Sequence, residues 1–217
     1  ADWTADIVQG RTAVLAYGSN AAPEQLRRKF AERPGCVIPV VQAELLDFDV
    51  VYSAHLTSYG TIPATLAPSP GTRLQTWITW LDDAQLARMH QSEMGKSWGA
   101  AVNYAYGHLS GIELHLDRDL ETLDRVGAYL SNHGALGIAD RPIAFAAIPA
   151  TGRIFDATPM REILATVAKS LAPSESLENF LTTAVEDAAV RANWTETLRR
   201  AAHPLDISMF RPDHLVK

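Results

Sequence analysis

The sequence predicts an α+β fold: a small, highly twisted mixed β-sheet or barrel surrounded by helices, with a helical C-terminal extension. Short apolar runs rich in β-branched and aromatic residues dominate residues 12–150, with short helical segments between them. Strands and helices do not alternate strictly there, which favours an α+β core over repeated βα units. From residue 158 onward the pattern is helical only. We therefore expect a domain over residues 1–155, on which residues 156–217 pack as the extension.

The first elements are a strand and a helix. Thr12–Tyr17 is an apolar run short enough to be a buried strand. A Gly-Ser-Asn turn follows, and Asn20 suits the N-cap of the next helix, with Pro23 in its first turn. Leu26 and Phe30 lie at helical spacing, so we expect them to face the core.

Four strands are expected next. Apolar runs at 37–41 and 45–52 indicate two strands. The runs 61–67 and 74–81 flank a Pro-to-Gly turn at 68–71 and are rich in β-branched and aromatic residues. This pattern is typical of a β-hairpin.

The central region predicts two helices around a pair of strands. Asp82 or Asp83 can cap a short helix from Ala84 to about Ser92, which Gly95 would stop. Residues 102–115 indicate two strands joined near Ser110-Gly111. Residues 119–130 place leucines and a valine on one helical face and therefore predict a helix.

A strand and two helices complete the predicted fold. Residues 142–148 form an apolar run that indicates a buried strand. Thr158-Pro159 is a cap followed by a first-turn proline, and Pro173 ends the helix that follows. A second helix should run from about Glu175 to just before Pro204.

Composition limits the functional classes. The net charge of −6 argues against a nucleic-acid surface, and the densest basic cluster, Arg27-Arg28-Lys29, is interpreted as the solvated face of a helix. No apolar run approaches the roughly 20 residues that span a bilayer. The single cysteine, Cys36, fits a reducing compartment and is interpreted as a small core residue. We expect a cytoplasmic protein without nucleic-acid or membrane partners.

Two segments carry residues suited to chemistry. A buried strand that ends in Gly18-Ser19-Asn20 and feeds a helix exposes main-chain N–H groups, which suit a carboxylate or a developing oxyanion. Glu93 lies near a helix end before Gly95, where a carboxylate can point into a pocket. The alternatives are an ordinary turn with an N-cap and a solvated glutamate.

Taken together, these segments resemble a known family. Tyr17-Gly18-Ser19-Asn20 after an apolar strand resembles the signature tetrapeptide of the γ-glutamyl cyclotransferases. Residues 60–68 are similar to the family's Gly-x-Ala-Thr-φ-x-Pro hairpin, with a two-residue difference in spacing. Residues 86–95 resemble its Leu-Asp-x-x-Glu-Gly segment and place Glu93 at the catalytic glutamate. Gly134-Ala135 matches a later Gly-Ala stretch more loosely, so the resemblance covers roughly residues 12–150.

The resemblance implies a reaction and a set of roles. The substrate's α-amine would attack its own γ-carbonyl and release 5-oxoproline and an amine, with Glu93 as general acid and base. Tyr17 and residues 18–20 would bind the substrate, and no metal or organic cofactor would take part. The partner would be a small γ-glutamyl compound, and the protein a monomer or homodimer. Met89, Met94 and Trp98 could supply apolar surroundings for the carboxylate.

The sequence also departs from the family pattern. Met89 and His90 stand where the family has Leu and Asp, and Met94 separates Glu93 from the glycine. A binding tyrosine is expected seven residues before Gly134-Ala135, where this chain has Gly127. Tyr129, two residues away, is the candidate substitute.

Other readings of the sequence stay open. One is a related cyclotransferase that removes a γ-glutamyl protecting group in a biosynthetic pathway; another is a non-catalytic binding module on the same fold. Ser19 could be a hydrolase nucleophile, although the Gly-x-Ser-x-Gly pattern is missing. A metal could bind at His90 with Glu93, or near His108, although neither group has recognised ligand spacing. Four tryptophans are read as core residues: Trp77, Trp80, Trp98 and Trp194.

Overall fold

The structure is a computed structural model that describes residues 5–32, 35–94, 103–117, 122–138 and 141–213. The chain forms two compact units. The first contains Ala1–Asp47, Arg73–Asn132 and Ile207–Lys217, and the second contains Phe48–Thr72 and His133–Asp206. Among the described residues, no helix is both long enough and apolar enough to cross a bilayer. The two units are described separately below, and the expected α+β class is confirmed.

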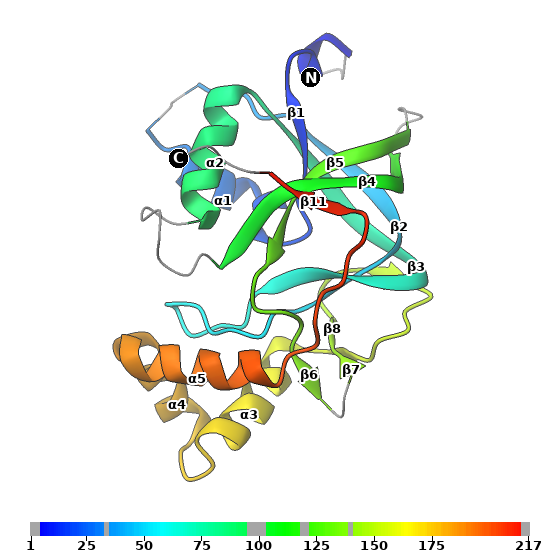
Figure 1. The fold of residues 1–217 in the computed structure, drawn as a ribbon. Coiled ribbons are helices and arrows are strands. Elements are labelled where there is room, and N and C mark those ends of the chain that lie inside the picture. Colours follow the sequence, from blue (N-terminus) through cyan, green and yellow to red (C-terminus); the bar gives the residue numbers. More distant parts are fainter. Residues whose placement is uncertain (1–4, 33–34, 95–102, 118–121, 139–140, 214–217) are drawn as a thin grey trace. The chain divides into compact units, whose positions relative to one another are not determined.

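The first unit is built on a closed mixed barrel of five strands (Figure 1). The strand order is β2-β3-β1-β5-β4, and a further pairing between β4 and β2 closes the ring. β1 runs antiparallel to β3 and parallel to β5, while β4 and β5 are antiparallel. A short strand, β11, adds to the outer edge of β4. The strands are β1 (Thr12–Leu15), β2 (Val40–Tyr52), β3 (Ala64–Leu81), β4 (Tyr104–Leu116), β5 (Thr122–Ser131) and β11 (Phe210–Pro212).

Two α-helices belong to this unit. They are α1 (Pro23–Lys29) and α2 (Asp83–Met94), and 3-10 turns occur at Ala5–Val8 and Ser19–Ala21. Asp82 caps α2, because its Oδ1 accepts from the Gln85 N–H at 2.8 Å, as the sequence predicted. A cluster of buried side chains joins both helices to the sheet: Val14, Leu26, Phe30, Leu81, Met89, Tyr106 and Tyr129. This cluster underlies the candidate site.

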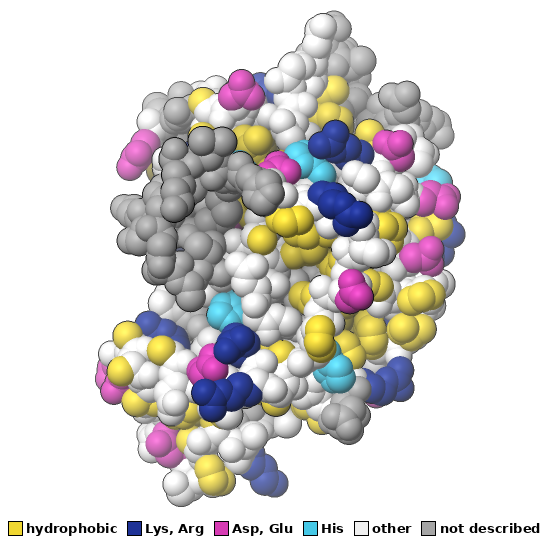
Figure 2. Space-filling view, in the orientation of Figure 1, with side chains coloured by type: hydrophobic (Ala, Val, Ile, Leu, Met, Phe, Trp, Pro, Cys, Tyr) yellow, Lys and Arg dark blue, Asp and Glu magenta, His cyan; other side chains and the backbone are white. Residues whose placement is uncertain are grey.

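The second unit combines the remaining parts of β2 and β3 with short strands and three helices. Its strands are β6 (Gly137–Ile138), β7 (Arg141–Pro142), β8 (Ala144–Phe145), β9 (Ala150–Thr151) and β10 (Ala157–Thr158), and its helices are α3 (Met160–Leu171), α4 (Leu177–Glu186) and α5 (Ala188–Arg200). Their apolar faces meet around Phe180, which stacks on Trp194. Figure 2 shows acidic and basic side chains gathered over α5, where Glu196 pairs with Arg199 and Arg200.

The predicted helix at 119–130 is wrong. Its described part is β5, whose residues pair with β4 on one side and β1 on the other. Leu123, Val126 and Leu130 fit helical spacing, but a short apolar run does not separate helix from buried strand. The run Val126–Ser131 is buried on both faces of the sheet, and this central position decided its conformation.

Three predicted breaks do not end a strand. Residues 40–52, 64–81 and 104–116 each form one strand where two were expected. Each carries a residue with positive φ: Asp47 at 63°, Gly71 at 81° and Gly111 at 71°. Beside Gly111 the pairing with β5 shifts register. The strand continues through each of these residues, and at Gly111 the register shift is typical of a β-bulge.

Smaller expectations also need correction. The tail is not helical only, because β11 follows the helices and Asp187 divides the predicted second helix into α4 and α5. Residues 142–148 hold only the end of β7 and the short β8. Cys36 is exposed rather than core. Trp77 is 41% exposed, whereas Trp194 is buried as predicted.

Candidate functional site

The predicted substrate loop follows β1 and is open to solvent. The Ala16 N–H bonds the Trp77 carbonyl at 2.8 Å, which fixes the end of the strand. Gly18 and Ser19 are exposed, and within the described residues their N–H groups donate to no acceptor. A 3-10 turn starts at Ser19, and α1 starts only at Pro23 with Ala22 at its N-cap. Asn20 is therefore not the N-cap that was predicted.

Lys29 joins this loop to α2. Its ammonium group bonds both the Asn20 side-chain oxygen and the Glu93 carboxylate, and it lies 3.6 Å from the Met89 sulfur. The Lys29 side chain is 12% exposed. The expectation that it belongs to a solvated basic face is wrong, although its neighbours Arg27 and Arg28 are exposed.

Glu93 points inward from the last turn of α2. Its side chain is 18% exposed, and Oε1 is the atom that pairs with Lys29. The Ser92 hydroxyl lies 3.5 Å from the same oxygen. Because one ammonium group contacts both Glu93 and Asn20, the carboxylate and the loop lie within the length of a small substrate. The structure thus brings the predicted acid/base residue and the predicted loop together.

Tyr129 is the second predicted contact that the fold brings to the loop. Tyr17 donates from its hydroxyl to the Tyr129 carbonyl oxygen. The Tyr129 hydroxyl shares a 2.7 Å hydrogen bond with His90 Nδ1. Burial raises the pKa of Tyr129, and the negative charge of Glu93 adds to this shift. Burial also lowers the pKa of His90, although Asp213 opposes that effect. His90 is therefore neutral at pH 7.

Tyr106 is a site residue that the sequence did not reveal. It packs against His90 and Tyr129, with ring centroids 4.5 and 5.0 Å away. Its hydroxyl lies over Gly127, where an added Cβ would be only 2.4 Å from the oxygen. Burial raises the pKa of Tyr106 to about 12. Gly127, where a binding tyrosine was expected, thus carries no side chain, and the Tyr106 phenol from β4 fills the space beside it.

Some predicted features do not join the site. Trp98 lies outside the described residues. Ser19 contacts no histidine or carboxylate in the part of the chain that is described, so nothing there activates it as a nucleophile. The described residues contain no group of three or more His, Cys, Asp or Glu side chains able to hold a metal. His108 instead pairs with Asp213 at 3.0 Å, and His115 with Glu113 at 2.7 Å.

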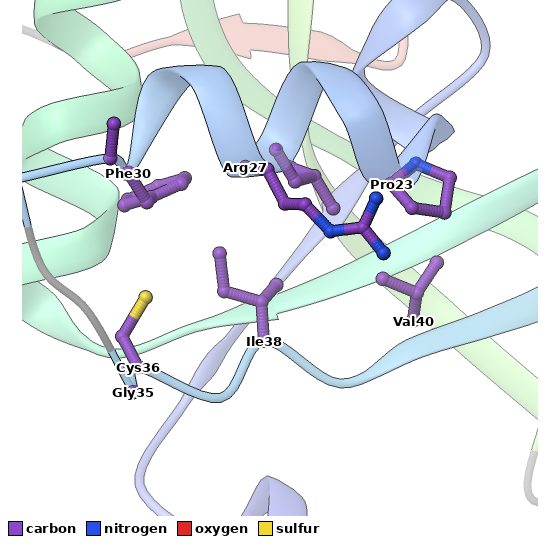
Figure 3. Close-up of a pocket in the computed structure, with 9 residues that line it drawn as sticks. Pro23, Arg27, Phe30, Gly35, Cys36, Ile38 and Val40 are labelled. Atoms are coloured by element: carbon purple, nitrogen blue, oxygen red, sulfur yellow. The ribbon is translucent and has the colours of Figure 1, made fainter.

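A separate pocket of about 430 Å³ lies between α1 and residues 35–40. Figure 3 shows Pro23 of α1 and Phe30, the residue after α1, on one side of it and Ile38 and Val40 on the other, with the Arg27 side chain extending toward Pro23 and Val40. The lining is mostly apolar and includes none of the predicted site residues.

Comparisons with known proteins concern the fold. No family model and no curated protein matches the sequence. A structure of a gamma-glutamyl cyclotransferase is similar at 14% identity and a TM-score of 0.44, covering 91% of each chain. The structure of an uncharacterized protein from Homo sapiens is similar at 14% identity and a TM-score of 0.44, and the match covers 92% of each chain. The structure of a gamma-glutamyl cyclotransferase specific to glutathione from yeast is similar at 12% identity and a TM-score of 0.39. The match covers 90% of this chain and 98% of the yeast chain. The function proposed below is therefore argued from the residues of this chain.

Proposed function

We propose that this protein is a cyclotransferase that converts a γ-glutamyl amine, amino acid or peptide into 5-oxoproline and the free amine. The observation that supports this best is the position of Glu93. The Glu93 carboxylate is largely shielded from water, and a single ammonium group, that of Lys29, contacts both this carboxylate and Asn20 in the solvent-exposed loop. The tetrapeptide resemblance at Tyr17–Asn20 points to the same reaction. A module that only binds a ligand could also use this carboxylate to hold an ammonium group, so turnover is the measurement that separates the two functions.

The chemistry needs a proton acceptor at the substrate's α-nitrogen. An ammonium group is not a nucleophile, so Glu93 takes one of its protons. The freed amine attacks the γ-carbonyl carbon, and a new carbon–nitrogen bond closes the five-membered ring. The bond from that carbon to the leaving nitrogen then breaks as Glu93 gives the proton to that nitrogen. The ring nitrogen loses its second surplus proton through the same carboxylate, so the products are a neutral lactam and the released amine as an ammonium ion. Because nucleophile and carbonyl belong to one molecule, much of the entropic cost of the reaction is already met.

The loop supplies hydrogen-bond donors to the substrate's negative groups. The exposed N–H groups of Gly18 and Ser19 have no acceptor among the described residues, so both remain available to a ligand. They suit the α-carboxylate or the oxygen that gains charge during attack. Tyr17 and Tyr129 hold the loop against β5 through their own hydrogen bond.

The test is a screen of γ-glutamyl amines and dipeptides for 5-oxoproline release, run beside Glu93→Gln. Glutamine keeps the shape of the side chain but cannot accept the proton. We expect turnover to fall by at least about 100-fold, the low end for a general acid/base. Glu24→Gln is the matched control, because Glu24 is an exposed carboxylate on α1 and should leave turnover unchanged. Equal rates for Glu93→Gln and the wild type would contradict this role for Glu93.

A further inference from the structure

The Glu93 carboxylate and the Lys29 ammonium form a pair of opposite charges at the edge of the loop. Both side chains are largely buried, at 18% and 12% exposed. The described contacts of the carboxylate all involve Oε1, which leaves Oε2 to receive a ligand. The site therefore presents an anion and a cation side by side, instead of a single negative charge.

The ammonium group of Lys29 also has capacity for a ligand. It carries three N–H donors. Two of them meet the oxygens of Glu93 and Asn20, and the remaining described contact is the Met89 sulfur at 3.6 Å, which is a weak acceptor. A carboxylate placed near the loop would give this donor a far better acceptor, because charge-assisted hydrogen bonds are about twice as strong as neutral ones.

The position of Lys29 is fixed from two sides. Arg88 on α2 donates to the Lys29 carbonyl oxygen at 2.9 Å, which ties the end of α1 to α2. Asn20 accepts from the ammonium at the other end of the side chain. A lysine that served only as a surface charge would have neither its head nor its backbone held in this way.

We propose that Lys29 selects substrates that carry a carboxylate beside the reacting ammonium group. The inference rests on the proposed function and deepens it, because it assigns recognition of the α-carboxylate to Lys29. The substrate's ammonium meets Glu93 Oε2, and its α-carboxylate meets Lys29 and the N–H groups of the loop. A compound without the carboxylate, such as a 4-aminobutyryl amide, forms no hydrogen bond with Lys29 and therefore binds less tightly.

The experiment measures binding by calorimetry, using L-glutamine and 4-aminobutanamide, which differ only in the α-carboxylate. We expect the wild type to bind L-glutamine at least about tenfold more tightly. In Lys29→Met, the methionine side chain fills similar space without a charge. The affinity of this variant for L-glutamine should be about 10- to 100-fold lower, because one charge-assisted hydrogen bond is lost. Binding of 4-aminobutanamide should stay within about threefold of the wild type. Lys29→Arg, which keeps the charge, should restore part of the preference.

Arg28→Met is the matched control, because Arg28 is the exposed neighbour on the same helix turn and should change neither affinity. If Lys29→Met weakens both compounds equally, Lys29 is only a structural partner of Glu93 and the inference is overturned. Equal binding of the two compounds by the wild type overturns it as well, and this holds whether or not the variant folds. If these binding results hold but no γ-glutamyl compound releases 5-oxoproline, the proposed reaction is wrong while the role of Lys29 in binding stands.

Discussion

The Tyr106 hydroxyl lies over Gly127, at a point where the backbone of β5 carries no side chain. An added Cβ at Gly127 would lie 2.4 Å from that oxygen and 3.2 Å from the Ala13 carbonyl oxygen. The Tyr106 ring cannot move aside freely, because it is 3% exposed and packed against His90 and Tyr129. Glycine is therefore required here by the close approach of a neighbouring ring, and not by its own backbone angles.

We expect Gly127→Ala to lower the free energy of unfolding by about 1–3 kcal/mol, as overpacking in a core does. Urea denaturation measures this loss. Tyr106→Phe alone should be neutral or slightly stabilising, because the hydroxyl has no hydrogen-bond partner among the described residues. Adding Tyr106→Phe to Gly127→Ala should recover part of the loss, since the closest atom is then removed. A Gly127→Ala variant as stable as the wild type would refute the argument.

The residues of the site differ in how well the sequence predicts them. The loop at 17–20 and Glu93 were found through a motif, because each is recognisable from its own neighbours. Lys29 and Tyr106 were missed because their roles depend on partners far along the chain. Lys29 meets Glu93 across 64 positions, and nothing in its local sequence separates it from the exposed Arg27 and Arg28.

At the scale of elements, periodicity identified α1, α2 and α3 but misjudged several strands. The helices have apolar residues at helical spacing, which local sequence determines, although among these three only α2 has a side-chain cap. For β5, apolar spacing allowed a helix, and pairing with β4 and β1 decided against it. Similarly, Gly71 and Gly111 suggested turns, yet the strands continue through both residues, each of which has a positive φ. Glycine and proline mark irregular backbone, but neighbouring strands decide whether a strand ends there.

The junction between α4 and α5 gives a prediction at this scale. Asp187 ends one helix and caps the next, and its Oδ1 accepts from the N–H groups of Ala189 and Val190, each at 2.9 Å. We expect Asp187→Ala to destabilise the protein by about 1 kcal/mol, the usual loss for an N-cap. Thermal unfolding measures the shift in Tm. Glu186→Ala, at the exposed preceding residue, should leave Tm unchanged, and equal Tm values for the two variants would contradict the capping role.

At the scale of the whole molecule, sequence order does not follow the division into units. Each unit is assembled from separate segments, and the final residues belong with the first 47. The short β11 illustrates the reason, because it pairs with β4 about a hundred positions earlier, at Leu109 and Phe210. Such pairing depends on the folded arrangement and leaves no periodic signal in three residues. The fold class was nevertheless predictable, since it depends on composition and on element order.

The second unit contains two neighbouring histidines whose burial makes stability depend on pH. The rings of His55 and His133 lie 4.4 Å apart, and the Ser53 hydroxyl lies 2.7 Å from His55 Nδ1. Burial lowers the pKa of His55 to about 3, with a contribution from His133. Burial also lowers the pKa of His133, and Arg199 adds to the effect. Both rings are therefore neutral in the folded chain at pH 7.

These shifts give an expected direction. Below pH 6.5 His55 binds a proton in the unfolded chain but stays neutral in the folded chain. The stabilisation from the neutral ring is therefore present in full above pH 6.5 and is lost as pH falls toward about 3. Each such histidine contributes a slope of up to about 1.4 kcal/mol per pH unit. Urea unfolding between pH 6.5 and 5 should show the fall before most carboxylates titrate. His55→Asn should flatten the slope, whereas His115→Asn, at a half-exposed surface ring, should preserve it. An unchanged slope in His55→Asn would mean that proton uptake at this buried ring does not govern acid sensitivity.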